Sequence, residues 1–367
     1  MANEPKTAYH LLGRSGLRVS PFALGAMTFG ENWGWGSPKE VVHQMIARYL
    51  ELGGNVIDTA DGYTDGNSER LIGEYFKQAG GRDRVVLASK FTLGATPGDP
   101  NSGGNGRKNI HRALEGSLAR LGTDYLDLYW LHAWDGMTPV EEVLGTLTDL
   151  VRAGKIRYAG FSDVPAWYFA RAQTLAERDR TTPIIAMQLE YSLVERNIER
   201  EHIPAALALG AAITPWSPLA SGMLSGKYTR AGVDARGEGR LPIIQASGNP
   251  GFTKLFTERN WAIVDTVVAV AHELDRSPAQ VALHWVATRP GVGSTILGAT
   301  KLAQLEDNLR ALDFTIPAPL LARLDEVSRP DLVHPYHFFE TEFFTNGRFT
   351  GGVKVRSEPL WFRRPAV

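Results

Sequence analysis

The sequence predicts an α/β protein, a (β/α)8 TIM barrel with an N-terminal β-hairpin and long loops at the carboxyl ends of its strands. Short apolar runs alternate with segments of helical period eight times, and such alternation is typical of a parallel sheet. Eight units are enough to close that sheet, and barrels run past about 250 residues as one domain, which suits 367 residues. No Gly-x-Gly-x-x-Gly fingerprint follows a strand, which argues against a two-lobed dinucleotide-binding fold.

The predicted strands are apolar runs bounded by turn residues. They fall at residues 23–26, 55–58, 84–89, 126–131, 156–161, 184–189, 211–214 and 293–297. Helical patterns fill the gaps between them. Two of these patterns open with Ser-Pro, so Ser37 and Ser277 are expected to cap helices that begin with a proline.

The ends and the long loops depart from this pattern. Residues 9–19 predict a β-hairpin that plugs the amino-terminal end of the barrel. Residues 92–108, 222–257 and 328–367 are too long for simple connections, and such loops are usually functional or disordered. We expect a single domain over 1–367 with its barrel core at about 20–327. The aromatic extension 328–367 is expected to be a lid over the site or a subunit contact.

Composition limits the classes of function. The formal net charge is −1, so the sequence indicates no basic face for nucleic acid or anionic lipid. The chain has no cysteine, which excludes disulfides, thiolate metal sites and thiol nucleophiles. No segment has the apolar length of a secretory signal or a membrane helix. We therefore expect a cytoplasmic protein that acts on small molecules.

Three consecutive predicted strands end on side chains that can do chemistry. The strand at 55–58 ends on Asp58, with Tyr63 on the loop beyond it. The next strand leads into Lys90, and the strand at 126–131 leads into His132. The carboxyl ends of barrel strands are where such folds place their active sites. The sequence therefore predicts a site made of these four residues.

These residue types point to protonation of a carbonyl oxygen. The free pKa of a tyrosine is about 10, so a catalytic phenol needs a neighbour that favours the phenolate. The ammonium of Lys90 can supply that, with Asp58 holding it in place, and both are expected to lower the pKa of Tyr63. His132 can donate to the same oxygen. With no cysteine to attack the carbon, hydride from a nicotinamide fits best.

With these residues in place, the chain resembles the aldo-keto reductase family over residues 9–327. Asp58, Tyr63, Lys90 and His132 match the family's Asp, Tyr, Lys and His tetrad in order and spacing. Residues 24–30 look like its first strand and following loop, and residues 118–128 look like the approach to its fourth strand. The resemblance implies reversible reduction of an aldehyde or ketone by NADPH, with NADH as the alternative cofactor.

The resemblance also implies a cofactor site. Ser162, Asp163 and Gln188 match its contacts to the nicotinamide carboxamide, and Trp216 matches the aromatic against the ring. The family usually has Asn where Asp163 stands, and a carboxylate accepts but does not donate a hydrogen bond. The loop expected over the pyrophosphate carries Ser217, Leu219, Gly222, Leu224 and Lys227.

The last strand leads into the segment where the family binds the adenosine 2′-phosphate. Gly298, Thr300 and Lys301 precede a helix whose start suits an anion. Gln304 stands where many members have arginine, whereas Thr300 and Lys301 still favour NADPH. By resemblance Asp307 and Asn308 reach the adenine.

Three tryptophans lie on loops beside the tetrad. Trp33, Trp35 and Trp134 predict a pocket for an apolar or aromatic carbonyl or alcohol substrate, or else they seal the loops against the barrel. No metal site is predicted. A calcium loop beginning at Asp61 would need glutamate where Ile72 stands, and the histidines lack zinc spacing.

A different function also fits the resemblance. Some members act as cofactor-sensing subunits with slow or no turnover, as the β subunits of potassium channels do. An intact tetrad is compatible with both functions. The physiological substrate and the oligomeric state stay open at this point.

Overall fold

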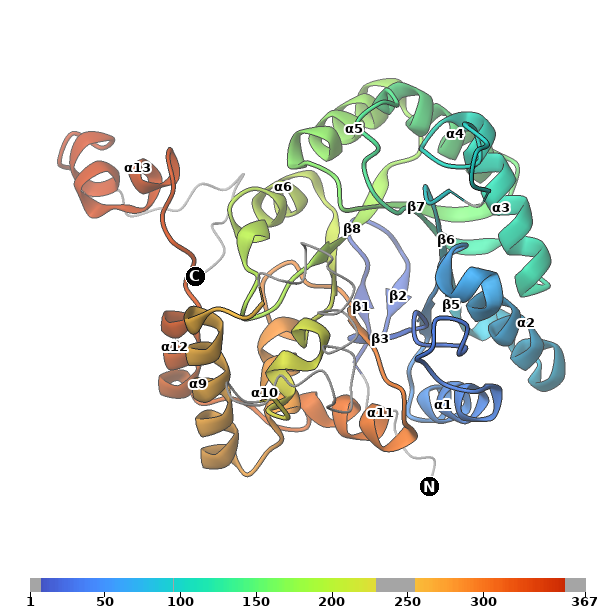
Figure 1. Ribbon diagram of the computed structural model, residues 1–367. Coiled ribbons are helices and arrows are strands. Elements are labelled where there is room, and N and C mark those ends of the chain that lie inside the picture. The colour runs from blue at the N-terminus through green and yellow to red at the C-terminus, as the bar shows by residue number, and fades with distance from the viewer. Residues whose placement is uncertain (1–7, 95, 229–254, 354–367) are drawn as a thin grey trace.

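A computed structural model describes residues 8–94, 96–228 and 255–353. Its centre is an eight-stranded parallel sheet in the order β10-β3-β4-β5-β6-β7-β8-β9, and helices surround it (Figure 1). The predicted TIM barrel is confirmed. All eight predicted strands exist, with ends that differ by up to a few residues: β3 Phe22–Gly25, β4 Val56–Asp58, β5 Val86–Phe91, β6 Leu126–Leu131, β7 Ile156–Ser162, β8 Ile184–Glu190, β9 Ala212–Trp216 and β10 Thr295–Leu297.

The two edge strands of the sheet meet and close the barrel. Ile213 of β9 forms a parallel bridge with Val292, just before β10. The Ile213 N–H donates to the carbonyl of Gly291 at 2.8 Å, and the Gly293 N–H donates to the carbonyl of Ile213 at 2.9 Å. These bonds satisfy backbone groups that an open edge would leave exposed.

A short hairpin covers the amino-terminal end of the barrel, as predicted. It consists of β1 His10–Leu11 and β2 Arg18–Val19, which pair antiparallel. Leu12 and Val19 are buried against Val56 and Val86, the first residues of β4 and β5. Gly13 has a positive φ of 60°, and a Cβ there would lie 2.2 Å from a backbone oxygen of β8. Only glycine fits this close approach.

Helices follow the strands and cover the barrel from outside (Figure 1). Their bounds are α1 Lys39–Glu51, α2 Asn67–Ala79, α3 Arg107–Leu121, α4 Val140–Arg152, α5 Ala166–Asp179, α6 His202–Leu209, α9 Glu258–Leu274, α10 Pro278–Ala287, α11 Leu302–Leu309, α12 Ala318–Val327 and α13 Tyr336–Glu340.

The two Ser-Pro sequences behave differently. Ser277 caps α10 and accepts a hydrogen bond from the N–H of Gln280 at 3.2 Å, so that prediction is confirmed. The prediction for Ser37 is wrong. Helix α1 begins at Lys39, and the Ser37 hydroxyl donates to the carbonyl of Thr300 at 3.1 Å, which makes it a tie to a distant loop.

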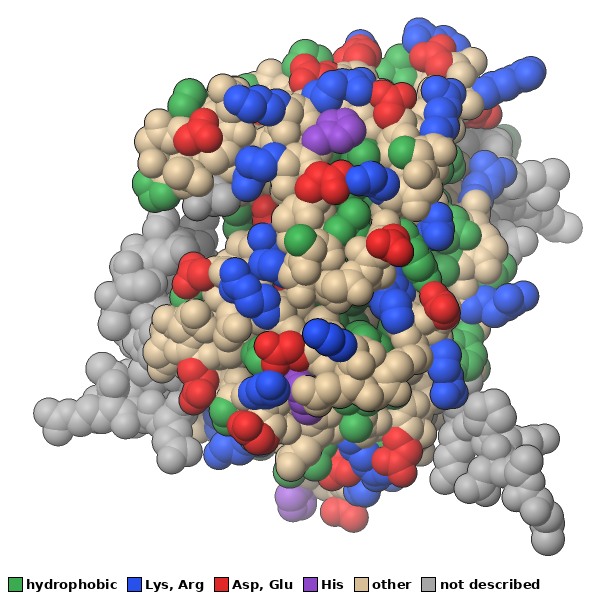
Figure 2. All heavy atoms as spheres, turned by 90° about the vertical axis from the view of Figure 1, so that its right-hand side faces the viewer, with side chains coloured by type: hydrophobic (Ala, Val, Ile, Leu, Met, Phe, Trp, Pro, Cys, Tyr) green, Lys and Arg blue, Asp and Glu red, His purple; other side chains and the backbone are tan. Residues whose placement is uncertain are grey.

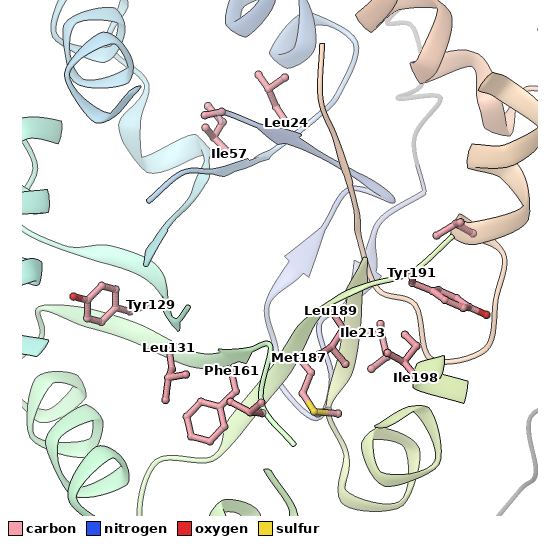
Figure 3. Packing of buried hydrophobic residues seen from close by; sticks show 14 of the residues in the cluster. Leu24, Ile57, Tyr129, Leu131, Phe161, Met187, Leu189, Tyr191, Ile198 and Ile213 are labelled. Atoms are coloured by element: carbon pink, nitrogen blue, oxygen red, sulfur yellow. The ribbon is translucent and has the colours of Figure 1, made fainter. Parts of the chain in front are cut away.

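Two apolar layers stabilise the fold. The larger lies between the strands and the surrounding helices, where Leu24, Ile57, Tyr129 and Phe161 point outward from the sheet (Figure 3). The smaller fills the barrel interior, with Trp130 as its largest member. A Cβ on Gly160 would lie 2.3 Å from the Trp130 ring, so glycine at that position gives the indole its space.

The C-terminal extension leaves the barrel after α12. Helix α13 and the π-helix Phe343–Arg348 stand beyond α6 and α12 (Figure 1). Arg200 donates to the carbonyl of Asp331 at 2.7 Å, and the Tyr336 hydroxyl donates to Glu201. The lid and the subunit contact both stay predictions for this extension.

Within the described ranges, no helix is long and apolar enough to cross a membrane. On the face shown in Figure 2, basic and acidic side chains are interspersed. That face therefore shows no broad basic patch of the kind that nucleic acid requires.

Candidate active site

The four predicted catalytic residues meet at the mouth of the barrel. Val56 of β4 and Val86 and Ala88 of β5 fill the interior with apolar side chains. Because side chains alternate along a strand, the next inward positions are Asp58 and Lys90, which form a polar layer above the apolar one. Polar chemistry therefore begins where the packed barrel core ends.

Lys90 is the centre of this polar layer. It is fully buried and forms an ion pair with Asp58, which is 4% exposed. Its Nζ also donates to the carbonyl of Thr59 at 2.8 Å and to the hydroxyl of Tyr63 at 3.1 Å. Burial by itself lowers the pKa of Lys90, but the charge of Asp58 and the contact with Tyr63 outweigh it and raise that pKa. Lys90 is therefore an ammonium that faces the phenol.

Tyr63 is held on a strained turn. The next two residues, Thr64 and Asp65, have positive φ angles of 45° and 58°, which is uncommon for residues other than glycine. The Thr64 hydroxyl donates to the carbonyl of Phe29 at 2.8 Å and accepts from the N–H of Ser68 at 2.9 Å. These bonds hold the turn in this conformation.

The predicted effect on the pKa of Tyr63 is wrong in its net direction. Burial raises the pKa of this phenol, the charge of Lys90 lowers it, and the charge of Asp58 raises it again. The net shift is upward because burial outweighs the ammonium, and the carboxylate cancels part of the help that the ammonium gives. Tyr63 therefore keeps its proton at neutral pH, as a proton donor must.

His132 lies directly beside this phenol. The rings of Tyr63 and His132 are edge to face with centroids 5.7 Å apart. Burial, together with the nearby charge of Lys90, lowers the pKa of His132 to about 3. The Nδ1 atom of its ring has no hydrogen-bond partner among the described residues. His132 is therefore a neutral imidazole that can hydrogen-bond an added molecule.

Gln188 joins the tetrad from the far side of the barrel. Its Nε2 donates to the second oxygen of Asp58 at 3.0 Å. Sequence reasoning predicted Gln188 as a cofactor contact and missed this bond, because no local pattern reports a contact between β4 and β8. The bond fixes the carboxylate that in turn fixes Lys90.

Two buried hydroxyls beside the tetrad lack partners. Ser162 ends β7 and Thr214 lies in β9, and neither side-chain oxygen has a hydrogen-bond partner in the described part of the chain. Burial of such groups is costly unless a ligand or water satisfies them. Sequence reasoning missed Thr214, although a lone hydroxyl two residues before Trp216 shares its side of the strand.

Comparison with known proteins agrees with this geometry. The family model described as the aldo/keto reductase family matches residues 21–329. The chain belongs to the aldo/keto reductase family. It is an oxidoreductase, because a family model that spans the barrel and oxidoreductase relatives agree with its tetrad.

The relatives of this aldo/keto reductase include proteins named as enzymes and a protein named as a channel subunit. It is 33% identical to aryl-alcohol dehydrogenase [NADP(+)] of Phanerodontia chrysosporium, over 88% of this chain and 86% of the relative. It is 32% identical to norsolorinic acid reductase of Aspergillus flavus, over 93% and 87%. It is also 34% identical to a Schizosaccharomyces pombe protein with the name of a voltage-gated potassium channel β subunit, over 88% and 94%.

One of the predicted carboxamide contacts of this aldo/keto reductase, Asp163, binds Trp216. Ser162 is buried, and Asp163 follows it with a positive φ of 43°. The Trp216 indole N–H donates to the Asp163 carboxylate at 3.1 Å. The loop beyond Trp216 contains Ser217 and Gly222, both with positive φ.

The remaining predicted residues of this loop divide by burial. Leu224 is fully buried, so a ligand could meet only its backbone, whereas Leu219 is partly buried and packs against the core. Lys227 is exposed, with its Nζ 4.9 Å from the ring centroid of Tyr228. Residues 229–254 of the predicted long loop lie outside the described residues.

The predicted phosphate segment follows β10 with Gly298. Lys301 is exposed at the start of α11. The Thr300 backbone N–H donates to the side-chain oxygen of Gln304 at 3.0 Å, which ties the first turn of α11 to the segment before it. The Thr28 hydroxyl donates to the carbonyl of Ala299 at 2.7 Å, and with Ser37 it ties the segment to the loop after β3.

The two predicted adenine contacts lie deeper on α11. Asn308 is buried. Both carboxylate oxygens of Asp307 accept hydrogen bonds from α10, one from Ser277 at 2.7 Å and one from Gln280 at 2.8 Å. Asp307 therefore also joins α11 to the start of α10.

The predicted tryptophans form two groups at the rim. The rings of Trp33 and Trp35 have centroids 5.7 Å apart. Trp134 lies edge to face with Trp167 at 5.8 Å. Trp167 opens α5 and is 57% exposed, but sequence reasoning missed it because a helix start carries no signal for a pocket.

Proposed function

We propose that this enzyme reduces an aldehyde or ketone to an alcohol with NADPH, reversibly, and that Tyr63 donates the proton. One observation carries the proposal: the Tyr63 hydroxyl lies 3.1 Å from the Lys90 ammonium, beside an imidazole that is neutral at working pH. A protonated phenol next to a cation can release its proton when negative charge develops on the oxygen it touches.

Each of the four residues has a distinct role in the proposal. Tyr63 and His132 hold the substrate oxygen, and Tyr63 gives it a proton. Lys90 stabilises the phenolate that remains, and Asp58 keeps Lys90 charged and in place. In the oxidation of an alcohol, the phenolate of Tyr63 takes the proton back.

The residues around Trp216 fit a nicotinamide cofactor, which when bound supplies or accepts the hydride. The buried Ser162 hydroxyl has no partner among the described residues and is free for a carboxamide. In our proposal Asp163 and Gln188 complete that contact, and Trp216 packs on the ring. Gln188 would reach a ligand if its side-chain amide released the hydrogen bond to Asp58.

Two segments are proposed to hold the rest of the cofactor. The loop from Ser217 to Lys227 lies beside the pyrophosphate, with Gly222, Leu219 and Leu224 contributing backbone. Gly298, Thr300 and Lys301 bind the 2′-phosphate, assisted by the start of α11. The positive charge of Lys301 at the proposed 2′-phosphate site favours NADPH over NADH. Gln304, Asp307 and Asn308 form the adenine end of the site.

An aromatic or apolar carbonyl compound is the proposed substrate class. Trp33 and Trp134 offer exposed flat surfaces on the loops that follow β3 and β6, at the same end of the barrel as the tetrad. Two of the relatives are named for an aryl alcohol and for norsolorinic acid. Trp33, Trp35 and Trp134 are therefore the residues expected to contact substrate.

Loss of reduced-nicotinamide absorbance tests the proposal. NADPH and NADH are compared with aromatic aldehydes, quinones, steroid-like ketones and sugars as substrates. Tyr63→Phe should lower turnover by about 10²- to 10⁴-fold and leave NADPH affinity nearly unchanged, because the phenyl ring keeps the packing. Full turnover in this variant would exclude Tyr63 as the proton donor.

A second function is favoured by the relative named as a channel subunit. In that case the barrel senses the state of its cofactor and turns over slowly or not at all. Saturable quenching of tryptophan fluorescence by NADPH without turnover on any substrate would support it. Turnover that depends on Tyr63 would favour the reductase.

A further inference from the structure

The backbone of Asp163 is clamped between neighbouring strands of the barrel mouth. Its N–H donates to the carbonyl of Gln188 at 3.2 Å, and its carbonyl accepts the N–H of Trp134 at 3.2 Å. These bonds hold the residue in its left-handed conformation. The direction of its side chain is therefore fixed by the fold.

The carboxylate of Asp163 has no ion-pair partner in the described parts of the chain. It accepts the indole N–H of Trp216 at 3.1 Å, which is a neutral donor. The nearest ammonium, Lys90, is already paired with Asp58. Asp163 thus presents a negative charge at the edge of the indole, whose face is where we propose that the nicotinamide packs.

The oxidised and reduced nicotinamide differ by one positive charge on the ring. A carboxylate a few ångströms away attracts the cationic ring and has little effect on the neutral one. We infer that Asp163 makes the site discriminate between the oxidation states of the cofactor, binding NADP⁺ more tightly than an uncharged side chain would allow. This inference rests on the proposed function, since it requires the nicotinamide at Trp216.

Other charged and titratable groups face Asp163 from each neighbouring strand. Lys90 of β5 opposes its charge, Glu190 of β8 adds to it, and His132 and Tyr63 are neutral. Burial raises the pKa of Asp163 to about 6, while the Trp216 bond and Lys90 oppose the rise. Burial also raises the pKa of Glu190 to about 7, assisted by Glu195 and by Asp163.

The preference of the site for NADP⁺ over NADPH should therefore depend on pH. Above pH 7 Asp163 is a carboxylate, and the preference for NADP⁺ is at its largest. Below pH 6 it is mostly protonated, and the preference fades. A residue with a purely structural role would show neither this profile nor a difference between the two cofactor forms.

Equilibrium binding of NADP⁺ and of NADPH, followed by tryptophan fluorescence, tests the inference. The wild type, Asp163→Asn, Glu190→Gln and Asp65→Asn are compared at pH 8 and pH 5.5. Asparagine tolerates the left-handed conformation, and its oxygen can still accept from Trp216. Asp65 is a matched control, because it also has positive φ on the tetrad side of the barrel but is exposed, and its side chain forms no hydrogen bond or ion pair with the tetrad among the described residues.

In Asp163→Asn at pH 8, the ratio of the dissociation constants of NADPH and NADP⁺ should fall about tenfold, which corresponds to about 1.4 kcal/mol. The wild type at pH 5.5 should approach the same ratio, and Asp65→Asn should leave it unchanged. An unchanged ratio in Asp163→Asn, with both forms still bound, would overturn this inference and leave the proposed function standing.

Two other results are equally decisive. A ratio that moves in Glu190→Gln but not in Asp163→Asn would assign the effect to Glu190 and overturn the role of Asp163. Failure of the wild type to bind either form would overturn the proposed function, and the inference with it.

Discussion

The two ends of the barrel use the same strands for opposite purposes. At the base, Leu12 and Val19 of the hairpin close an apolar layer that begins with Val56 and Val86. At the mouth, the last inward positions of the same strands are Asp58 and Lys90, which are charged and almost fully buried. Burial of apolar side chains stabilises the base. Burial of charged side chains at the mouth costs stability but holds these charges in place.

Several unsatisfied buried groups and left-handed residues lie at the mouth. Buried side-chain atoms without a described partner include the Ser162 hydroxyl and His132 Nδ1, both at the mouth. Left-handed backbone at Thr64, Asp163 and Ser217 lies there as well. The difference teaches that removal of a side chain should have effects of opposite kind at the two ends: a loss of stability at the base and a loss of chemistry at the mouth.

The largest expected effect comes from breaking the buried ion pair. Lys90→Met leaves Asp58 charged and buried, so the free energy of unfolding should fall by about 3–5 kcal/mol. Turnover should fall by at least about 10²-fold, because Tyr63 loses its cation. Urea unfolding and the NADPH assay measure the two effects.

A double variant separates stability from chemistry at this pair. Lys90→Met with Asp58→Asn removes both charges, and most of the lost stability should return because no unpaired charge stays buried. Turnover should stay lost. Recovery of turnover in the double variant would contradict the role of Lys90.

The hairpin at the base provides the next effect. Leu12→Ala should lower the free energy of unfolding by about 2–4 kcal/mol, because the side chain is 2% exposed and packs inside the barrel. The adjacent Leu11 is 60% exposed, so Leu11→Ala should cost less than about 0.5 kcal/mol. KM for NADPH should be unchanged in both, and a large rise in KM for Leu12→Ala would break the separation of the two ends.

Asp61 provides the smallest effect, with the opposite sign. Burial raises the pKa of Asp61 to about 7, and the charge of Glu69 adds to the rise. The native protein therefore holds this proton more tightly than the unfolded chain, so stability is full below about pH 4 and falls as pH rises through 7. Asp61→Asn removes the penalty and should be more stable than the wild type at pH 8 by on the order of 2 kcal/mol.

The pH dependence provides the check on Asp61. Thermal unfolding at pH 5 and pH 8 should show the advantage of Asp61→Asn growing with pH. A constant difference would mean that Asp61 is already ionised in the native protein.

The sequence predicted the parts of this molecule that depend on local patterns. All eight strands are where apolar runs occur, because each run is short, bounded by turn residues and buried. The tetrad could be predicted because reactive side chains at the carboxyl ends of neighbouring parallel strands must lie close together. The cofactor residues were predicted from the family resemblance.

Contacts between distant segments could not be predicted in this way. The bond from Gln188 to Asp58 joins positions 130 residues apart, and the direction of the Tyr63 pKa depends on burial that only the fold determines. Ser37 and Ser277 are each followed by proline, yet only Ser277 caps a helix, because the Ser37 hydroxyl finds the carbonyl of Thr300 instead. The Ser-Pro dipeptide is shared, and the tertiary neighbour decides what the serine binds.

The hairpin at the base also gives a practical way to orient the molecule on a solid support. The chain contains no cysteine, so Leu11→Cys would introduce its sole thiol at an exposed position. That position lies at the end of the barrel opposite the tetrad. Coupling through it to an electrode or a bead would leave the catalytic opening facing the solution, and every attached molecule would point the same way.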